Sequence, residues 1–96
     1  MQDLNNKFEQ KQIEDLNYKS DQEQLEAVKS NGYAIQYIKN PSETVKLAAV
    51  KQNWGAIKHI TNPSEEMQLE AVKQYRFAVV YIKNPTEAVK LAAQSK

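Results

Sequence analysis

Residue types that commonly carry chemistry are scarce in this chain. Its 96 residues include no cysteine, a single histidine and only two glycines. Without cysteine, the chain can form neither a disulfide nor a thiolate zinc site. The two isolated glycines, Gly32 and Gly55, do not form a glycine-rich phosphate-binding loop.

Long apolar segments are absent as well. No apolar run approaches the roughly 20 residues that a membrane-spanning helix needs, so we expect no membrane partner. The first residues, Met1 to Lys7, contain no apolar segment typical of a secretory signal peptide. We therefore expect a cytoplasmic protein.

The charges nearly cancel. Thirteen basic residues stand against twelve acidic ones, which gives a formal net charge of +1 and favours no class of charged partner. Arg76 is the only arginine, and all other basic residues are lysines. Because arginine is preferred for contacts to phosphates and base edges, this composition argues against specific recognition of nucleic acid.

What the chain does contain is an internal repeat with a period of 22 residues. Its clearest marker is Asn-Pro-Ser-Glu, which begins at residues 40 and 62 and returns as Asn-Pro-Thr-Glu at residue 84. Leucine, valine and isoleucine at helical spacing can form a core, and alanine allows close helix contact. We interpret as structural the apolar positions that recur with this period, which are Leu25, Leu47, Leu69 and Leu91; Ala27, Ala49, Ala71 and Ala93; Val28, Val50 and Val72; Ala34, Ala56 and Ala78; and Ile38, Ile60 and Ile82.

A fixed period in this range is typical of an array of identical supersecondary units. We predict an all-α fold, namely a short α-solenoid of 22-residue helix-turn-helix repeats with polar capping ends. The chain would form a single domain over residues 1–96. Its predicted parts are an N-terminal capping helix within 1–18, repeats at 19–40, 41–62 and 63–84, and a C-terminal half-repeat at 85–96.

The marker segment predicts the start of a helix. Asparagine would be the N-cap, proline the first helical residue, and glutamate would reach back to the N-cap from position N3. The first repeat lacks proline, but Ser20 and Glu23 have the spacing of a capping box. A shorter helix would follow each long one and end at the next Asn-Pro. The predicted ranges are 41–52, 63–74 and 85–94 for the long helices and 33–39, 55–61 and 77–83 for the short ones, with a left-handed cap at Asn31-Gly32.

The repeated unit Asn-Pro-Ser-Glu-x-Val-x-Leu-x-Ala-Val-Lys-x-Asn-Gly-x-Ala-Ile-x-Tyr-Ile resembles a short α-helical repeat family of unknown function in bacterial and phage proteins. The resemblance runs from about Leu25 to Ala93 and is carried by residues 40–43, 49–53 and 81–85. Trp54 and the segment at 75–77 depart from the pattern. The resemblance implies a bacterial or phage origin and a binding role, and it brings no catalytic residue with it.

No residue pattern indicates catalysis, a metal or a cofactor. His59 falls in one column with Tyr37 and Tyr81, so we interpret it as a ring that fills the same slot rather than as a metal ligand. Helix capping accounts for the serines and glutamates of the markers, and no nucleophile motif or set of convergent polar groups is evident. We expect a protein that is not an enzyme and uses no cofactor.

A stripe of lysines recurs at the ends of the long helices, at Lys29, Lys51 and Lys73. Such a stripe could follow a phosphate backbone. Placement at the negative end of a helix explains every member equally well, and Glu26 and Glu70 reduce the positive field.

The positions at which the units differ are the candidates for partner binding, because Trp, Tyr and Arg are enriched at interface hot spots. The predicted site comprises Trp54, Tyr75, Arg76 and Phe77 in the variable turns, with Lys58, Tyr37, His59 and Tyr81 on the short helices. The alternative is structural. Trp54 and Phe77 could fill gaps left by a lost glycine, and Arg76 and Lys58 could be solvated surface charges.

These observations favour a non-enzymatic protein-binding module, present as a monomer or a homodimer. A phage-encoded inhibitor of a host defence protein, comparable to anti-CRISPR proteins, is the sharper hypothesis, and it follows from the family resemblance alone. Two alternatives remain open, which are a structural protein that self-assembles through its repeat ends and a helical repeat that binds nucleic acid.

Overall fold

The computed structural model describes residues 15–94, and all regular structure in this range is helical. Four α-helices alternate with short 3-10 helices. In chain order these are η1 (Asp15–Tyr18), α2 (Asp21–Ser30), η2 (Gly32–Tyr37), α3 (Glu43–Gln52), η3 (Trp54–His59), α4 (Glu65–Gln74), η4 (Arg76–Tyr81) and α5 (Glu87–Gln94). The predicted all-α class is confirmed.

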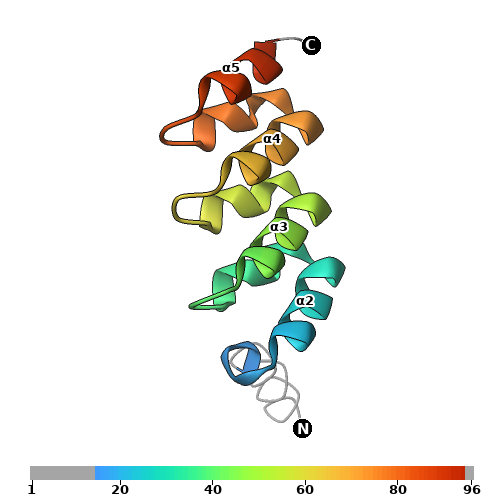
Figure 1. Ribbon diagram of the computed structural model, residues 1–96. Helices are drawn as coiled ribbons and strands as arrows, with labels where there is room; N and C mark the ends of the chain where they lie inside the picture. Colours follow the sequence, from blue (N-terminus) through green and yellow to red (C-terminus); the bar gives the residue numbers. More distant parts are fainter. Residues whose placement is uncertain (1–14, 95–96) are drawn as a thin grey trace, which may run out of the picture.

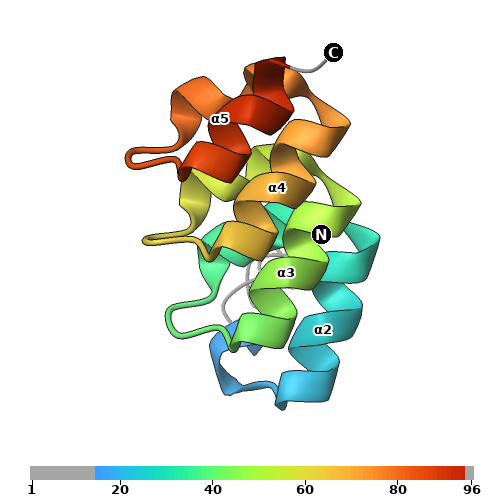
Figure 2. The ribbon, with the colours of Figure 1, turned by 45° about the horizontal axis from the view of Figure 1, so that its top comes forward.

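The helices stack as repeated pairs in two rows. Helices α2 to α5 follow one another along the molecule in sequence order (Figure 1), and η2, η3 and η4 form the second row. Each helix contacts its own partner and the neighbouring pairs. The loops that lead into α3, α4 and α5 all project to the same side in both views (Figure 2). The stack is elongated, with principal extents of 52 × 25 × 19 Å, as expected for a solenoid whose units touch only their neighbours.

Serine and threonine, rather than asparagine, cap the long helices. The hydroxyls of Ser42 and Ser64 each accept a hydrogen bond, at 3.2 Å, from the backbone N–H three residues ahead, and Thr86 does the same before α5. The predicted asparagine N-caps and N1 prolines are therefore wrong. Asn62 has a φ of 55°, a left-handed conformation that asparagine tolerates, so it turns the loop two residues before the cap.

The capping box at the first repeat is confirmed. The Ser20 hydroxyl accepts from the Glu23 backbone N–H at 3.2 Å, and the Ser20 backbone N–H donates to Glu23 Oε1 at 3.0 Å. Glu23 Oε1 therefore accepts from the Ser20 backbone N–H, and it also accepts from the Ser20 hydroxyl at 3.1 Å. Both of these hydrogen bonds favour the charged form, so they lower the pKa of the Glu23 carboxyl, the backbone one most.

Two asparagine side chains shape the turns between paired helices. Asn31 and Asn53 have extended backbones, with φ of −153° and −157°. Their Oδ1 atoms accept from the N–H groups of Tyr33, at 3.1 Å, and Gly55, at 2.8 Å, so each side chain caps a 3-10 helix. No glycine between residues 15 and 94 has a positive φ, and the predicted left-handed cap at Asn31-Gly32 is wrong.

The short helices end earlier than predicted. Each stops two residues before the predicted end, because the chain becomes extended at Ile38, Ile60 and Ile82. This change of direction buries the isoleucine side chains in the core. Asn-Pro therefore belongs to the loop and does not terminate the helix.

Most of the recurring apolar positions form the core or pack against it, as predicted, whereas the prediction is wrong for Leu91, which is exposed. Val28, Val50 and Val72 are buried, as are Ala49 and Ala71. They belong to one continuous cluster that runs from α2 to α5. The residues Leu25, Leu47 and Leu69 are partly buried and pack against this cluster.

The prediction of polar capping ends can be compared with the structure mainly at the C-terminal end of the stack. Most of the predicted N-terminal capping helix lies outside the described residues. At the other end, Gln94 is exposed in the place of the column valine. Leu91 is 62% exposed, because no further helix pair follows within the described chain, so the C-terminal end is not wholly polar.

Candidate functional site

Four aromatic rings from two adjacent units form a contiguous row, which we call the aromatic ladder. It consists of Trp54, Tyr75, Phe77 and Tyr81. The Trp54 ring lies 4.7 Å from the Tyr75 ring and 5.8 Å from the Tyr81 ring, centroid to centroid, at interplanar angles of 38° and 35°. Phe77 meets Tyr75 edge to face at 5.6 Å. Such pairs each contribute roughly 0.5–1.5 kcal/mol beyond the burial of area.

The ladder exists because the second and third units break the asparagine-glycine turn. Tyr75 takes the place of the capping asparagine and makes no side-chain cap. The backbone there is still extended, with a φ of −155°. The tyrosine ring is therefore not used in the turn and lies against Trp54, which takes the place of Gly32.

Two cations lie on the ladder. Lys58 Nζ is 5.2 Å from the Trp54 ring centroid and 4.5 Å from that of Tyr81. Arg76 Cζ is 4.8 Å from the Phe77 centroid. Exposed cation–π contacts are worth about 0.5–1 kcal/mol each, enough to hold these side chains near the rings.

The ladder is largely a surface feature. Tyr75, Phe77 and Tyr81 are 43%, 52% and 51% exposed. Trp54 is half-buried and also packs against the core. Trp54 therefore does fill space against the core, as the structural alternative predicts, in addition to its contacts in the ladder. Phe77 does not fill the core.

The structure brings six of the eight predicted binding residues together. These are Trp54, Tyr75, Phe77, Tyr81, Lys58 and Arg76. His59 instead meets the ring of Tyr33 edge to face at 6.0 Å. Tyr37 is 45% exposed on η2 and takes part in no ring contact within the described residues.

Two open notches between successive loops were not anticipated. The first, of about 210 Å³, lies between the segments 38–41 and 59–61. The second, of about 400 Å³, lies between 60–63 and 82–84 and is also lined by Tyr81 of the ladder and by Lys58, which lies on the ladder. No acidic side chain lines either notch. The signal in the sequence is the lack of Asp and Glu in the segments 31–41, 53–63 and 75–85.

The wall of the second notch contains Gln68, which is 6% exposed. Its Nε2 donates to the Pro63 carbonyl at 2.9 Å. Its Oε1 is buried and has no hydrogen-bond partner. Buried acceptors normally have donors, so this atom is the one unexplained polar group that the notch contains among the described residues.

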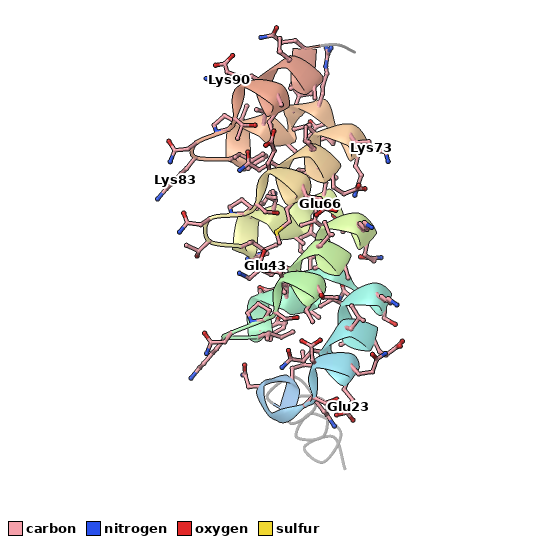
Figure 3. The ribbon with its side chains drawn as sticks, viewed as in Figure 1. Glu23, Glu43, Glu66, Lys73, Lys83 and Lys90 are labelled. Carbon is pink, nitrogen blue, oxygen red and sulfur yellow. The ribbon has the colours of Figure 1, made fainter. Side chains whose placement is uncertain are left out.

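The remaining candidate chemistry does not assemble into a site. Lys73 extends from the edge opposite Lys83 and the loops (Figure 3), so the lysine stripe and the notches do not share a surface there. Within residues 15–94, no cluster of His, Cys, Asp or Glu could hold a metal ion. In the same range no helix is long and apolar enough to cross a membrane.

No protein-family model, curated protein or solved structure matches the chain. Its function is therefore inferred from the residues of the site.

Proposed function

We propose that the chain is a non-enzymatic protein-binding module whose docking surface is the aromatic ladder with Lys58 and Arg76. The observation that carries this proposal is the convergence of the variable turn residues on one exposed aromatic surface. Large exposed rings on a small protein mark interaction sites, and Trp, Tyr and Arg dominate binding energy at interfaces.

The scaffold beneath this surface supports the proposal because hydrogen bonds tie the units together. The Gly32 N–H donates to Gln52 Oε1 at 2.6 Å, across one unit boundary. Gln74 Nε2 donates to the Val50 carbonyl, also at 2.6 Å, across the next. A rigid surface loses little conformational entropy on binding.

The biological setting is part of the same proposal. The resemblance to bacterial and phage repeats supports a phage-encoded inhibitor that acts in the cytoplasm of the infected cell. A host defence protein is the target class that we propose, by comparison with anti-CRISPR proteins. Such an inhibitor would act by occluding a surface and would need no cofactor.

Affinity capture from a bacterial lysate, with mass spectrometry, tests the docking surface. The chain offers a matched pair of variants, Tyr81→Ser and Tyr37→Ser, because both tyrosines occupy the same repeat position with similar exposure. We expect Tyr81→Ser to reduce recovery of the partner about tenfold or more and Tyr37→Ser to retain it. Equal recovery by both variants would refute the ladder as the docking surface. If the captured partner is a defence nuclease, its activity should be inhibited by the wild type and not by Tyr81→Ser.

Self-association is a second candidate function, and the C-terminal end favours it. Leu91 is exposed, whereas the equivalent Leu25, Leu47 and Leu69 are partly buried and pack against the core. Beside this end lies an open hollow of about 440 Å³, lined in part by Phe77, Val79 and Ala93. Analytical ultracentrifugation of the wild type and Leu91→Glu decides the question, because a wild type that stays monomeric at all concentrations excludes it.

A further inference from the structure

Charge is strongly segregated in this nearly neutral chain. The η helices and the loops that follow them, at 31–41, 53–63 and 75–85, carry four cations and no acid. The other described residues carry nine acids and six cations. These helices and loops therefore carry a net positive charge, and positive surfaces attract and orient anionic partners.

The second notch lies between two of these segments and adjoins the ladder. Lys58 links the two, since its ammonium lies against the rings of Trp54 and Tyr81 and the residue also lines the notch. Lys83 lines the same notch from the opposite loop, and its side chain projects away from the helices (Figure 3). In the first notch, by contrast, Lys46 is already paired with Glu43 at 3.1 Å.

Three side-chain amides line the second notch, those of Asn62, Asn84 and Gln68. Amide groups both donate and accept hydrogen bonds, and they match the free N–H and C=O groups of an extended peptide. A helix offers no such groups along its length, because its backbone bonds are satisfied internally. The Gln68 amide is the least accessible of the three, since its Nε2 donates to the Pro63 carbonyl and its Oε1 is buried.

We propose that the partner presents an extended, acidic protein segment. An apolar side chain of this segment lies on the aromatic ladder, and the carboxylates of the segment lie between Lys58 and Lys83 in the second notch. The backbone amides of the segment meet the side-chain amides of Asn62 and Asn84. This inference rests on the proposed protein-binding function and specifies the chemistry of the partner.

The ring geometry favours a protein segment over nucleic acid. Proteins that bind single strands offer open aromatic faces on which bases stack. In the ladder, the rings of Trp54, Tyr75 and Tyr81 lie against one another, and Lys58 lies over two of them. These faces are partly occupied, and the exposed parts of the rings suit apolar side chains.

Selection from a random displayed-peptide library against the full chain tests the inference. We expect the enriched peptides to contain more Asp and Glu than the unselected library, together with an aromatic or aliphatic residue. Their affinity should fall at least about tenfold on Lys58→Glu/Lys83→Glu, because like charges at an interface repel. The control reversal Lys29→Glu/Lys73→Glu alters the lysine stripe and should leave affinity unchanged. Circular dichroism checks that each variant is folded.

The possible outcomes separate the two levels of the proposal. Enriched peptides without excess acid that are lost on Tyr81→Ser would overturn the acidic segment and leave protein binding intact. Peptides that bind Tyr81→Ser with the same affinity as the wild type would overturn both protein binding and the acidic segment for this surface. The absence of any enriched peptide would do the same. A fluorescent single-stranded oligonucleotide that binds the wild type but not Lys58→Glu/Lys83→Glu would overturn the inference and assign the surface to nucleic acid.

Discussion

Replacing Gly32 with alanine tests how tightly the repeat units fit. Gly32 is buried at the start of η2, and a Cβ there would lie 2.5 Å from the Ala49 carbonyl oxygen. That oxygen is fixed, because it accepts the N–H of Asn53 at 2.9 Å at the end of α3. The φ of Gly32 is not positive, so the cost of a side chain comes from this contact and not from the backbone conformation.

The loss of stability in Gly32→Ala can be estimated from the contacts that the added Cβ displaces. Relieving the overlap separates η2 from α3 and weakens the hydrogen bond between Gly32 N–H and Gln52 Oε1. Overpacking costs roughly 1–3 kcal/mol, and the hydrogen bond contributes about 1 kcal/mol. Reduced freedom of the unfolded chain offsets about 0.4–1 kcal/mol. We expect a net loss of roughly 1–3 kcal/mol, which lowers the thermal midpoint by about 4–8 °C for each kcal/mol.

The matched control is Gly55→Ala. A Cβ at Gly55 would meet the hydroxyl end of Tyr33, which can rotate away at the expense of its edge contact with His59. This variant should therefore remain within about 1 kcal/mol of the wild type. Urea unfolding, followed by circular dichroism and by the fluorescence of the single tryptophan, measures both.

The repeat pattern alone predicts the opposite of this expectation, because Trp54 and Arg76 occupy the same repeat position as Gly32. A Gly32→Ala protein as stable as the wild type would refute the close fit of η2 against α3. The same conclusion would follow if Gly55→Ala were the more destabilised of the two.

Three further predictions concern stability. Met67 is 2% exposed, so Met67→Ala should lower the free energy of unfolding by roughly 2–5 kcal/mol in urea titrations; a smaller loss would contradict its place in the core. Leu69→Ala should cost clearly more than Leu91→Ala, which should stay within about 0.5 kcal/mol of the wild type, because only the first leucine is covered; equal losses would count against an open C-terminal end. Since hydrogen bonds lower the pKa of Glu23 from 4.5, the stability it adds is present above that pH and is lost as the pH falls through the lowered value. The thermal midpoints of the wild type and Glu23→Gln should therefore converge in acid, and a gap of constant size would refute this role.

Much of the fold could be predicted because each unit depends on local pattern and on its neighbours. The recurring Val28, Val50 and Val72 are buried as expected, and the capping box of Ser20 and Glu23 forms as its spacing predicts. Both are short-range properties, set by helical periodicity and by hydrogen bonds within one turn. They need no knowledge of the rest of the chain.

The helix starts were harder to predict, because asparagine and serine or threonine are all good caps and the two candidates stand two residues apart in every marker. Local preference does not choose between them. The choice depends on the loop that reaches the next unit, in which Asn62 takes a left-handed conformation and Ser64 is left to cap α4.

For the candidate site, composition at the variable turns was enough to nominate aromatic and basic residues. Their grouping was not predictable, since it depends on how one unit lies on the next. Stacking brings Lys58 and Tyr81 to Trp54, while His59, the neighbour of Lys58 in sequence, turns to Tyr33. Adjacent positions on a 3-10 helix point in different directions, and only contacts between units select which of them share a surface.

The acid-free segments at 31–41, 53–63 and 75–85 show what the sequence determines and what the tertiary structure adds. Their charges are written in the sequence and follow from the repeat. That two of these segments enclose a notch lined by Lys58 and Lys83 follows from the parallel stacking of the units. A period of 22 residues specifies what recurs, and the packing of side chains between neighbouring units specifies which of the recurring residues meet.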